Sequence, residues 1–497
     1  MLKHKHLTQQ RTNLLRQVIL VIALALSPLA TFGQDLDFAP CALTGSGGNG
    51  NLHAECATWL RPLDPENADS EQIEIFVAKL RSTSNTPAKD ALTLINGGPG
   101  GSSIDLMIQF APLLNAFTRD RDIIVLDQRG TGRSSQLTCP SVADDPENYD
   151  PEIVPEIIAA CLEELPYDPR FFTTSAAVMD LDALRQALGY DQLTIYGVSY
   201  GTRVAMHYMR RYPDKARAVI IDGVVPPSEV LGSQVAIHSQ QTLDMVLGRC
   251  VEEESCFEKF DDSTETFQIV ASRLKESPIN MVLAHPVTGV QTDIELGYAH
   301  LIAWIRFSLY APEMAALIPI ILHEAAYNDN YVPVASNALR LLHNVTTSMA
   351  YGMHNAVVCS EDAPFYPMEE VNNEALENTY IGRDMYDTLK SMCDHWPEGY
   401  RHEDIKQPLQ SDIPTLVLSG EADPITPPTW GDAVMPGLTN ALHIIAPGQG
   451  HGTIARGCMP QLIQSFVEEP MPRELDASCI DRLKPFPFFL NLLGPNP

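Results

Sequence analysis

The stretch IYGVSYGTR, residues 195–203, places a serine between two glycines at the end of an apolar run. A helical pattern follows directly, so Ser199 stands at a sharp turn from a buried strand into a helix. Gly197 and Gly201 leave room where side chains would collide with that strand and helix. The turn exposes the serine hydroxyl beside the positive end of the helix. Gly-x-Ser-x-Gly alone is a modest signal, but this context favours a nucleophile over a simple turn.

Other apolar runs along the chain end at small or turn residues in the same way. Continuous runs of Val, Ile and Leu are typical of parallel strands that are buried on both faces. Helical patterns lie between them, as in residues 174–189. This alternation predicts an α/β fold with a mostly parallel, doubly wound sheet. The predicted strands are residues 92–100, 122–130, 193–201, 218–227, 415–424 and 442–452.

The spacing of these strands breaks once, in a long region of helical patterns. We expect this region to be a helical insertion that forms a lid over the carboxyl ends of the strands. The predicted core therefore has two parts, residues 34–227 and 411–497, and the lid spans residues 228–410. Near the start, residues 72–82 alternate like an edge strand, and residues 41–56 are predicted to be a Gly-rich loop bounded by cysteines.

Residues 1–33 have the pattern of a secretory signal peptide. A basic start precedes the apolar run QVILVIALALSPLA, which is short for a bilayer span. We expect cleavage after Gly33, and an uncleaved anchor is the alternative. No other stretch is long and apolar enough to cross a membrane, so the mature chain is expected to be periplasmic or extracellular without stable membrane association.

Ten cysteines fit such an exported chain. They include no Cys-x-x-Cys pair, and histidines and cysteines do not cluster at ligand spacing, so neither a metal nor a cofactor is predicted. We expect neighbours in the sequence to form disulfides, each stabilising the fold by about 2–4 kcal/mol. The expected pairs are Cys41 with Cys56, Cys139 with Cys161, Cys250 with Cys256, Cys359 with Cys393, and Cys458 with Cys479.

The chain has 63 acidic and 33 basic residues and a net charge of −30. Such acidity argues against a nucleic-acid partner, because phosphates would be repelled. A solvated, soluble surface is the simpler interpretation. The alternative is a field that attracts cationic substrates.

A serine hydroxyl needs a base to take its proton and a third group to orient that base. Asp423 and His451 follow later predicted strands, so both are expected at the carboxyl edge of the sheet beside the serine. Glu421 is the second choice for the acid. Of the other histidines, His207 lies on a predicted helix and His443 within a predicted strand, which favours structural roles for both.

The negative oxygen of a tetrahedral intermediate needs hydrogen-bond donors aimed at it. One predicted donor is the backbone N–H of Tyr200, next to the serine. The other is expected from the glycine-rich loop NGGPGGSS, residues 96–103, where we assign Gly98 as the donor and Gly97 as the second choice. A structural turn is the alternative for this loop. In LDQRGTGRSS, Asp127 and Arg129 are expected to pair and to fix a loop that borders the pocket.

Together these motifs resemble the proline iminopeptidase and tripeptidyl aminopeptidase family of α/β-hydrolases. The resemblance rests on NGGPG (96–100), DQRGTGRS (127–134), GVSYG (197–201) and the loops of Asp423 and His451. DLDALRQALGYDQLTIYGVSYGTR and ATWLRPLDPEN are most similar to the secreted tripeptidyl aminopeptidases. Asn96 is a departure, because many iminopeptidases have histidine there.

The resemblance implies an aminopeptidase that acts on peptide substrates with a free N-terminus. Buried carboxylates in the lid would hold the substrate ammonium, and Glu361 and Asp362 in CSED are candidates for this role. The alternative is a solvated acidic pair on a loop.

Two other functions remain open at this point. An esterase or lipase would use the same three residues, so the catalytic residues do not separate it from a peptidase. A binding protein on a hydrolase scaffold is disfavoured by the intact serine, acid and histidine set.

Overall fold

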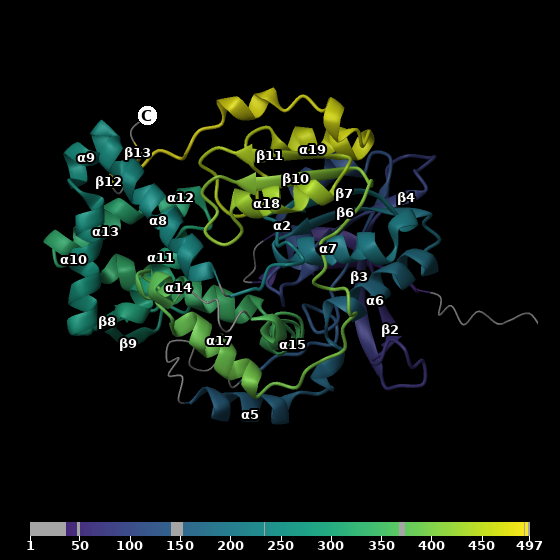
Figure 1. Ribbon diagram of the computed structural model, residues 1–497, viewed down its shortest axis with the longest axis horizontal. Helices are drawn as coiled ribbons and strands as arrows, with labels where there is room; N and C mark the ends of the chain where they lie inside the picture. The colour runs from purple at the N-terminus through teal and green to yellow at the C-terminus, as the bar shows by residue number, and fades with distance from the viewer. Residues whose placement is uncertain are drawn as a thin grey trace, which may run out of the picture. The chain divides into compact units, whose positions relative to one another are not determined.

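One mixed sheet organises the chain. The computed structural model describes residues 36–46, 50–140, 153–232, 234–366, 373–491 and 493–495. Among these residues, nine strands form the sheet in the order β1-β2-β3-β5-β4-β6-β7-β10-β11 (Figure 1). The strands are β1 (Ala39–Thr44), β2 (Asn51–Pro62), β3 (Gln72–Leu80), β4 (Asp90–Ile95), β5 (Asp122–Leu126), β6 (Gln192–Val198), β7 (Ala216–Asp222), β10 (Thr415–Gly420) and β11 (Ala441–Ala446).

The strands β5, β4, β6, β7, β10 and β11 are parallel to one another, as the continuous apolar runs predict. Every residue of β4 and β10 is buried, which matches strands covered on both faces. β1, β2 and β3 extend the sheet as antiparallel strands beyond β5. The prediction of an α/β fold with a mostly parallel, doubly wound sheet is confirmed.

Two expectations for the start of the chain are wrong. Residues 41–56 are not one loop, because most of them form the β1–β2 hairpin, in which Ala39 pairs with Cys56. Residues 72–82 are not an edge strand, because β3 lies between β2 and β5. The alternation in β3 comes from one solvent-exposed face near its start, and an exposed face leaves the same pattern as an exposed edge.

Helices cover both faces of this sheet. The first group, α2 (Ser103–Gln109), α3 (Ala111–Phe117) and α19 (Met459–Glu468), shares an apolar core with alternate residues of the parallel strands. α7 (Tyr200–Arg211) packs against β4, β6 and β7, and α6 (Thr174–Ala187) packs against α7. α18 (Pro428–Val434) packs against β10 and β11.

The long segment between β7 and β10 adds no described residue to the nine-stranded sheet. Its helices have an apolar core of their own. The predicted helical patterns of this segment form helices, but the β8–β9 hairpin was not expected. The elements are α8 (Val235–Glu252), α9 (Glu254–Phe260), α10 (Ser263–Glu276), β8 (Ile279–Ala284), β9 (Gln291–Leu296), α11 (Tyr298–Ser308), α12 (Pro312–Ala315), α13 (Ile318–Tyr327), α14 (Val332–Ser348), α15 (Tyr351–Glu361), α16 (Asn373–Glu377) and α17 (Asp384–Asp394).

Short elements complete the described chain. They are α5 (Val154–Glu164), η2 (Pro169–Phe171), η3 (Pro213–Lys215), η4 (Ala363–Phe365), η5 (Met435–Gly437), η6 (Pro472–Glu474), η7 (Ser478–Arg482), β12 (Phe489–Asn491) and β13 (Gly494–Pro495). The predicted signal peptide, residues 1–33, lies outside the described residues.

Five disulfides join the ten cysteines, all of which lie in the described part of the chain. The pairing is the one predicted, each cysteine with its neighbour in the sequence. Disulfides on this scale form and persist in oxidising compartments and are rare in the cytosol. The protein is therefore extracytoplasmic.

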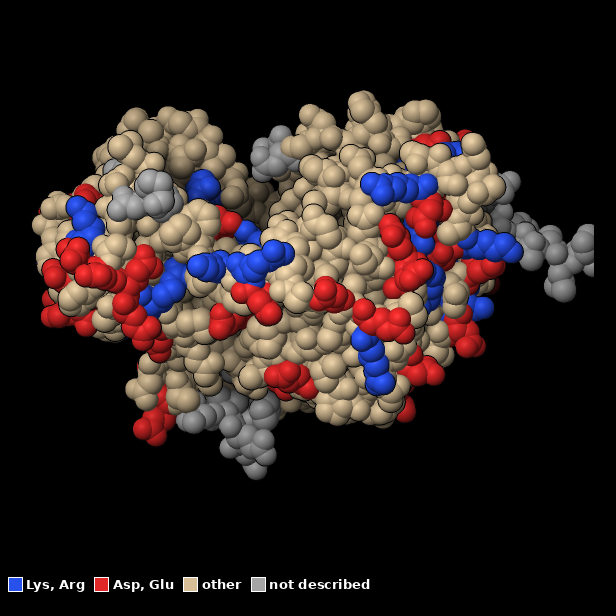
Figure 2. All heavy atoms as spheres, turned by 90° about the horizontal axis from the view of Figure 1, so that it is seen from above, with Lys and Arg blue, Asp and Glu red and all other residues tan. Residues whose placement is uncertain are grey.

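Acidic side chains are spread over the surface in several groups with basic side chains between them (Figure 2). On the face drawn, they do not gather into a single patch, which favours the interpretation of a solvated surface. Within the described residues, none of the helices has the length and apolar character needed to cross a membrane.

Candidate active site

Ser199 stands at a strained turn between β6 and α7. Its backbone has φ 57° and ψ −129°, a conformation that non-glycine residues rarely adopt. Its N–H donates to the carbonyl of Asp222 at 2.9 Å, and its carbonyl accepts from the Thr202 hydroxyl at 2.6 Å. The turn is therefore fixed from β7 on one side and from α7 on the other, with the serine side chain partly exposed.

The glycines around the serine are required by close approach. A Cβ on Gly197 would lie 2.4 Å from the Gly201 carbonyl, and one on Gly201 would lie 2.3 Å from the Ile95 carbonyl. This confirms the predicted reason for the two glycines. Gly97 was not assigned this role, yet a Cβ there would lie 2.5 Å from Cβ of Ser199. The glycine-rich loop after β4 thus lies directly against the serine.

Asp423 and His451 meet at the carboxyl edge of β10 and β11. Nδ1 of His451 lies 2.8 Å from Oδ2 of Asp423. The other oxygen of Asp423 accepts the backbone N–H groups of Ile425 and Thr426, each at 2.9 Å. The Thr426 hydroxyl donates to Oδ2 at 2.7 Å. The aspartate is thus fully engaged and fixes the imidazole in one orientation.

This contact sets the ionisation of both groups. Burial works against the charge on Asp423, but contact with His451 and the two backbone N–H groups outweighs it, so the aspartate pKa lies below its usual value. Burial also lowers the pKa of His451, but Asp423, with help from Asp222, raises it above its usual value. An ionised acid beside a basic imidazole is the arrangement that general-base catalysis requires.

Gly223 brings the histidine and the serine to the same place. It follows Asp222, whose carbonyl binds the Ser199 N–H. A Cβ on Gly223 would lie 3.1 Å from Cε1 of His451, so the imidazole packs against this glycine. Ser199 and His451 therefore both lie against the segment formed by Asp222 and Gly223.

The Asp222 carboxylate fixes the loop that carries the histidine. Its oxygens accept the backbone N–H groups of Thr453 and Ile454, at 2.7 and 3.0 Å, and the Tyr196 hydroxyl at 2.9 Å. Burial raises the pKa of Asp222, and these hydrogen bonds oppose the rise. The insertion adds Tyr310, whose ring centroid lies 5.1 Å from that of His451 and whose carbonyl accepts the His451 N–H at 2.9 Å.

The loop after β4 is built around Asn96. Its amide donates to the Ser102 carbonyl at 2.9 Å, and its oxygen accepts the Gly97 N–H at 2.8 Å. The Gly97 N–H is therefore occupied. Within the described chain, no partner is recorded for the N–H of Gly98 or of Tyr200. This difference favours Gly98 over Gly97 as the second donor.

The expected pairing of Asp127 with Arg129 is wrong. Asp127 accepts hydrogen bonds from the Ser102 hydroxyl and from the Ile104 and Arg133 N–H groups. Arg129 turns the other way and makes two bonds to Asp180, at 2.8 and 3.0 Å. Asp127 thus fixes the loop after β4 directly, and Arg129 ties the loop after β5 to α6.

Glu361 and Asp362 lie at the end of α15, and both are fully buried. Glu361 accepts the N–H and the hydroxyl of Thr174, each at 2.6 Å, and the same hydroxyl lies 2.6 Å from the phenol of Tyr200. Burial raises the pKa of Glu361 to about 7, and the Thr174 hydrogen bonds oppose that rise.

Asp362 has two cationic partners. Arg203 binds both of its oxygens at 2.9 Å, and Lys406 approaches Oδ1 to 2.5 Å. Burial would raise the pKa of Asp362, but Arg203 and Lys406 together lower it below its usual value. An incoming ammonium would have to displace these partners, and the substrate-binding role of the two acids stays a prediction.

The remaining candidates have structural partners. Oε2 of Glu421 accepts the Gly448 N–H at 2.7 Å. His443 lies between Ser419 and Asp432, at 2.9 Å from each. His207 is 2.8 Å from His402, and burial lowers its pKa to about 3.

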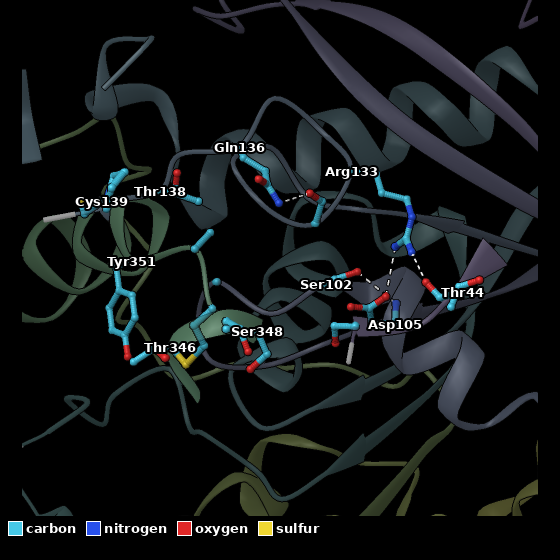
Figure 3. A pocket seen from close by; sticks show the side chains of 17 residues that line it. Thr44, Ser102, Asp105, Arg133, Gln136, Thr138, Cys139, Thr346, Ser348 and Tyr351 are labelled. Carbon is cyan, nitrogen blue, oxygen red and sulfur yellow. Dashed lines mark hydrogen bonds and ion pairs between the residues drawn. The ribbon is translucent and has the colours of Figure 1, made fainter. Parts of the chain in front are cut away.

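A cavity of about 470 Å³, lined mostly by residues of polar type, lies beside the loop after β4 (Figure 3). Its wall includes Gly100 and Ser102 of that loop and Ala350 at the start of α15, whose N–H donates to the Gly100 carbonyl at 3.1 Å. Arg133 and Asp105, which both line the cavity, form an ion pair with an N–O distance of 3.1 Å. The insertion thus contacts the loop on the side of this cavity as well.

Sequence reasoning missed Thr426, Asp222, Tyr310 and His354. Asp222 was visible as a charged residue at the end of a buried strand, and Thr426 as a hydroxyl three residues after the acid. Tyr310 and His354 belong to the insertion, and no local pattern marks either. Nδ1 of His354 lies 3.2 Å from the Pro99 carbonyl, so this side chain contacts the loop after β4.

Known proteins are similar to this chain, one over most of its length and others over about a third. The serine protease Hip1 of Mycobacterium tuberculosis is 24% identical over 469 residues, 88% of this chain and 89% of that protein. The tripeptidyl aminopeptidase of Streptomyces lividans is 27% identical over 196 residues, 35% of this chain and 36% of that protein. Carboxylesterase B of M. tuberculosis is 29% identical over 195 residues, 35% of this chain and 37% of that protein.

Two family profiles match separate parts of the sequence. The alpha/beta hydrolase fold matches residues 90–249, which include the serine turn and the loop after β4. The TAP-like protein profile matches residues 378–479, which include Asp423 and His451. The chain is a serine hydrolase with an α/β-hydrolase fold and a TAP-like C-terminal region.

Proposed function

We propose that this protein is an exported serine aminopeptidase that hydrolyses peptide bonds near free N-termini. Ser199 attacks the carbonyl carbon, His451 takes its proton and returns it to the leaving amine, and Asp423 orients His451. An acyl-enzyme forms, and water activated by the same imidazole releases the product.

The contact between Asp423 and His451 carries this proposal. At 2.8 Å it holds the imidazole against Gly223, next to the residue that binds the N–H of the strained serine. The N–H groups of Gly98 and Tyr200 would receive the negative oxygen of the intermediate. Each such donor typically contributes about 100- to 1,000-fold to kcat.

The choice of a peptidase rests on the relatives. Hip1, named a serine protease, aligns along nearly the whole chain, whereas the tripeptidyl aminopeptidase aligns over about a third. The disulfides favour a periplasmic or extracellular site of action. The insertion between β7 and β10 would act as the lid, because Tyr310 packs on His451 and Ala350 binds the loop after β4.

An ester hydrolase is the second candidate, because carboxylesterase B aligns with as large a share of this chain as the tripeptidyl aminopeptidase does. A panel of aminoacyl and tripeptidyl amides set against short acyl esters separates the two. We expect higher kcat/KM on amides with a free N-terminus than on the same amides with an acetylated N-terminus. A preference for esters with no effect of acetylation would favour the esterase.

The nucleophile is tested by a fluorophosphonate probe. Wild-type protein should be labelled at Ser199, and Ser199→Ala should not be labelled and should lose all but a weak residual activity. Ser175→Ala is a matched control, because that serine lies on α6, where its hydroxyl accepts the His402 N–H at 2.9 Å. Labelling that persists in Ser199→Ala would overturn the assignment.

The predicted ammonium site has its own test in the same panel. Replacing Glu361 and Asp362 by Gln and Asn should raise KM for substrates with a free amine and spare neutral esters. An unchanged KM for both substrate types would remove these two acids from the substrate site.

A further inference from the structure

The insertion carries a cation that has no carboxylate partner. Arg306 lies on α11, and its Nε is buried without a hydrogen-bond partner among the described residues. No ion pair of its guanidinium is recorded in the described chain either. The fully buried arginines, Arg129 and Arg203, both bind carboxylates. Its guanidinium lies 4.9 Å from the centroid of the Phe307 ring and acts on Tyr310, but neither side chain supplies a negative charge. An arginine without a carboxylate partner is unexpected in a chain with nearly twice as many acids as bases.

Arg306 stands one helical turn before Tyr310. The Leu309 N–H donates to the Ile305 carbonyl at 3.1 Å, so the helical turn continues beyond the end of α11. Residues four apart in a helix share a face. Arg306 therefore lies on the side of α11 where Tyr310 packs against the His451 ring.

His354 is a second side chain of the insertion that lies near Arg306. It projects from α15 to the Pro99 carbonyl in the loop that carries the predicted oxyanion donor. Burial raises the pKa of Tyr310 and lowers the pKa of His354, and the charge of Arg306 acts to lower both. The guanidinium is thus close to both side chains, between the His451 loop and the loop after β4.

We propose that Arg306 is a substrate-binding residue that pairs with a carboxylate of the peptide held beside Ser199. This inference rests on the proposed function, because it places the substrate between these two loops. A guanidinium binds carboxylates through two parallel hydrogen bonds, which fix position as well as affinity. Keeping a partly desolvated cation without a countercharge is costly, and a bound carboxylate would supply that charge.

Two sources provide this chemistry. One is the free C-terminal carboxylate of a short peptide, and the other is an Asp or Glu side chain within a longer one. Matched peptides separate them: a free acid against its C-terminal amide, and a glutamate peptide against its glutamine counterpart, both amidated. Binding is measured with Ser199→Ala protein, so that turnover does not interfere.

We expect one of the two pairs to show a preference of about 10- to 100-fold for the carboxylate, the range of a charge-assisted hydrogen bond. Arg306→Met should reduce this ratio to near one, and Arg306→Lys should keep part of it. Arg340→Met on α14 is the control, since Arg340 bonds to Asn337, and this variant should keep the full ratio. Thermal unfolding of each variant shows whether it is folded.

The possible failures are distinguishable. Fluorophosphonate labelling of the wild type tests the proposed function without any carboxylate. If the wild type is labelled but shows no preference in either pair, the role of Arg306 is overturned. The same holds if the preference survives in Arg306→Met. If labelling fails, the proposed function falls first. If Arg306→Met does not fold, the preference of the wild type for the carboxylate peptide and its partial loss in Arg306→Lys still test the role of Arg306.

Discussion

Two buried aspartates border the candidate active site and differ in their partners. Asp423 faces an imidazole whose pKa it raises, and its other contacts are hydrogen bonds from Thr426 and Ile425. Asp362 faces the permanent cation of Arg203 and the ammonium of Lys406. Both carboxylates are almost entirely buried.

The difference shows that a buried carboxylate can serve either catalysis or the stability of the fold, depending on its partners. A carboxylate with one titratable partner stabilises the charge that appears on that partner during a reaction. A carboxylate that binds a buried guanidinium and a buried ammonium holds segments together, here α7, α15 and the chain at Lys406. Replacing each aspartate should therefore damage different properties.

The largest expected effect is on catalysis, from Asp423→Asn. An asparagine of the same shape would favour the wrong imidazole tautomer and could not stabilise an imidazolium, so kcat should fall by about 10⁴-fold. Steady-state kinetics on the best amide of the panel measures it. A loss below tenfold would show that Asp423 does not orient the base.

The pH profile sharpens the same prediction. His451 must be neutral to accept a proton, so activity falls as pH drops below its raised pKa. Without the Asp423 charge that pKa falls, and the acidic limb of kcat/KM should move to lower pH in Asp423→Asn. An acidic limb at the same pH in both proteins would assign it to another group.

These residues also show what the sequence predicts and what it does not. Ser199, Asp423 and His451 each follow an apolar run that forms a parallel strand, and parallel strands bring their carboxyl ends to one edge. The six parallel strands, and the placement of these three residues after three of them, could therefore be predicted from local patterns. The disulfide pairing was a hypothesis from sequence neighbours, because spacing does not fix connectivity, and the structure confirms it.

The contacts of the insertion with the core could not be predicted in this way, because they join residues far apart in the sequence. The acids at 361 and 362 were visible, but nothing near them in the sequence indicates Thr174, Arg203 or Lys406. Arg306 and Tyr310 reach the site only because α11 ends beside the His451 loop. Alternation in residues 72–82 was misinterpreted for a related reason, since strand order is not a local property.

The second prediction concerns stability, through Asp362→Asn. This change leaves Arg203 and Lys406 buried together without their carboxylate, and breaking such a pair costs about 3–5 kcal/mol. The free energy of unfolding, from denaturant titration at pH 7, should fall accordingly. The activity of the folded fraction toward neutral esters should change far less than in Asp423→Asn.

Asp432→Asn is the matched control. Asp432 also pairs with a basic side chain, His443, but two thirds of its side chain is exposed. The free energy of unfolding should change by less than about 1 kcal/mol. Equal losses in the two variants would contradict the distinction between the buried and the exposed pair.

The smallest expected effect is the pH dependence that Glu361 gives to stability. In the folded protein its pKa is about 7, against 4.5 for an unperturbed glutamate, because burial disfavours the charge. Between these values the folded state binds more protons than the unfolded state. The free energy of unfolding must therefore fall as pH rises from about 4.5 to 7, by roughly 3 kcal/mol in total.

Glu361→Gln removes this titration and keeps a side chain of the same shape next to Thr174. Its stability relative to the wild type should rise with pH across that window and level off above it. Comparing the two proteins cancels the other groups, including the opposite contribution of Asp362 at lower pH. A difference that is constant from pH 4.5 to 8 would mean that Glu361 is ionised throughout, stabilised by the Arg203 charge despite its burial, and the two acids would then belong to one ion cluster.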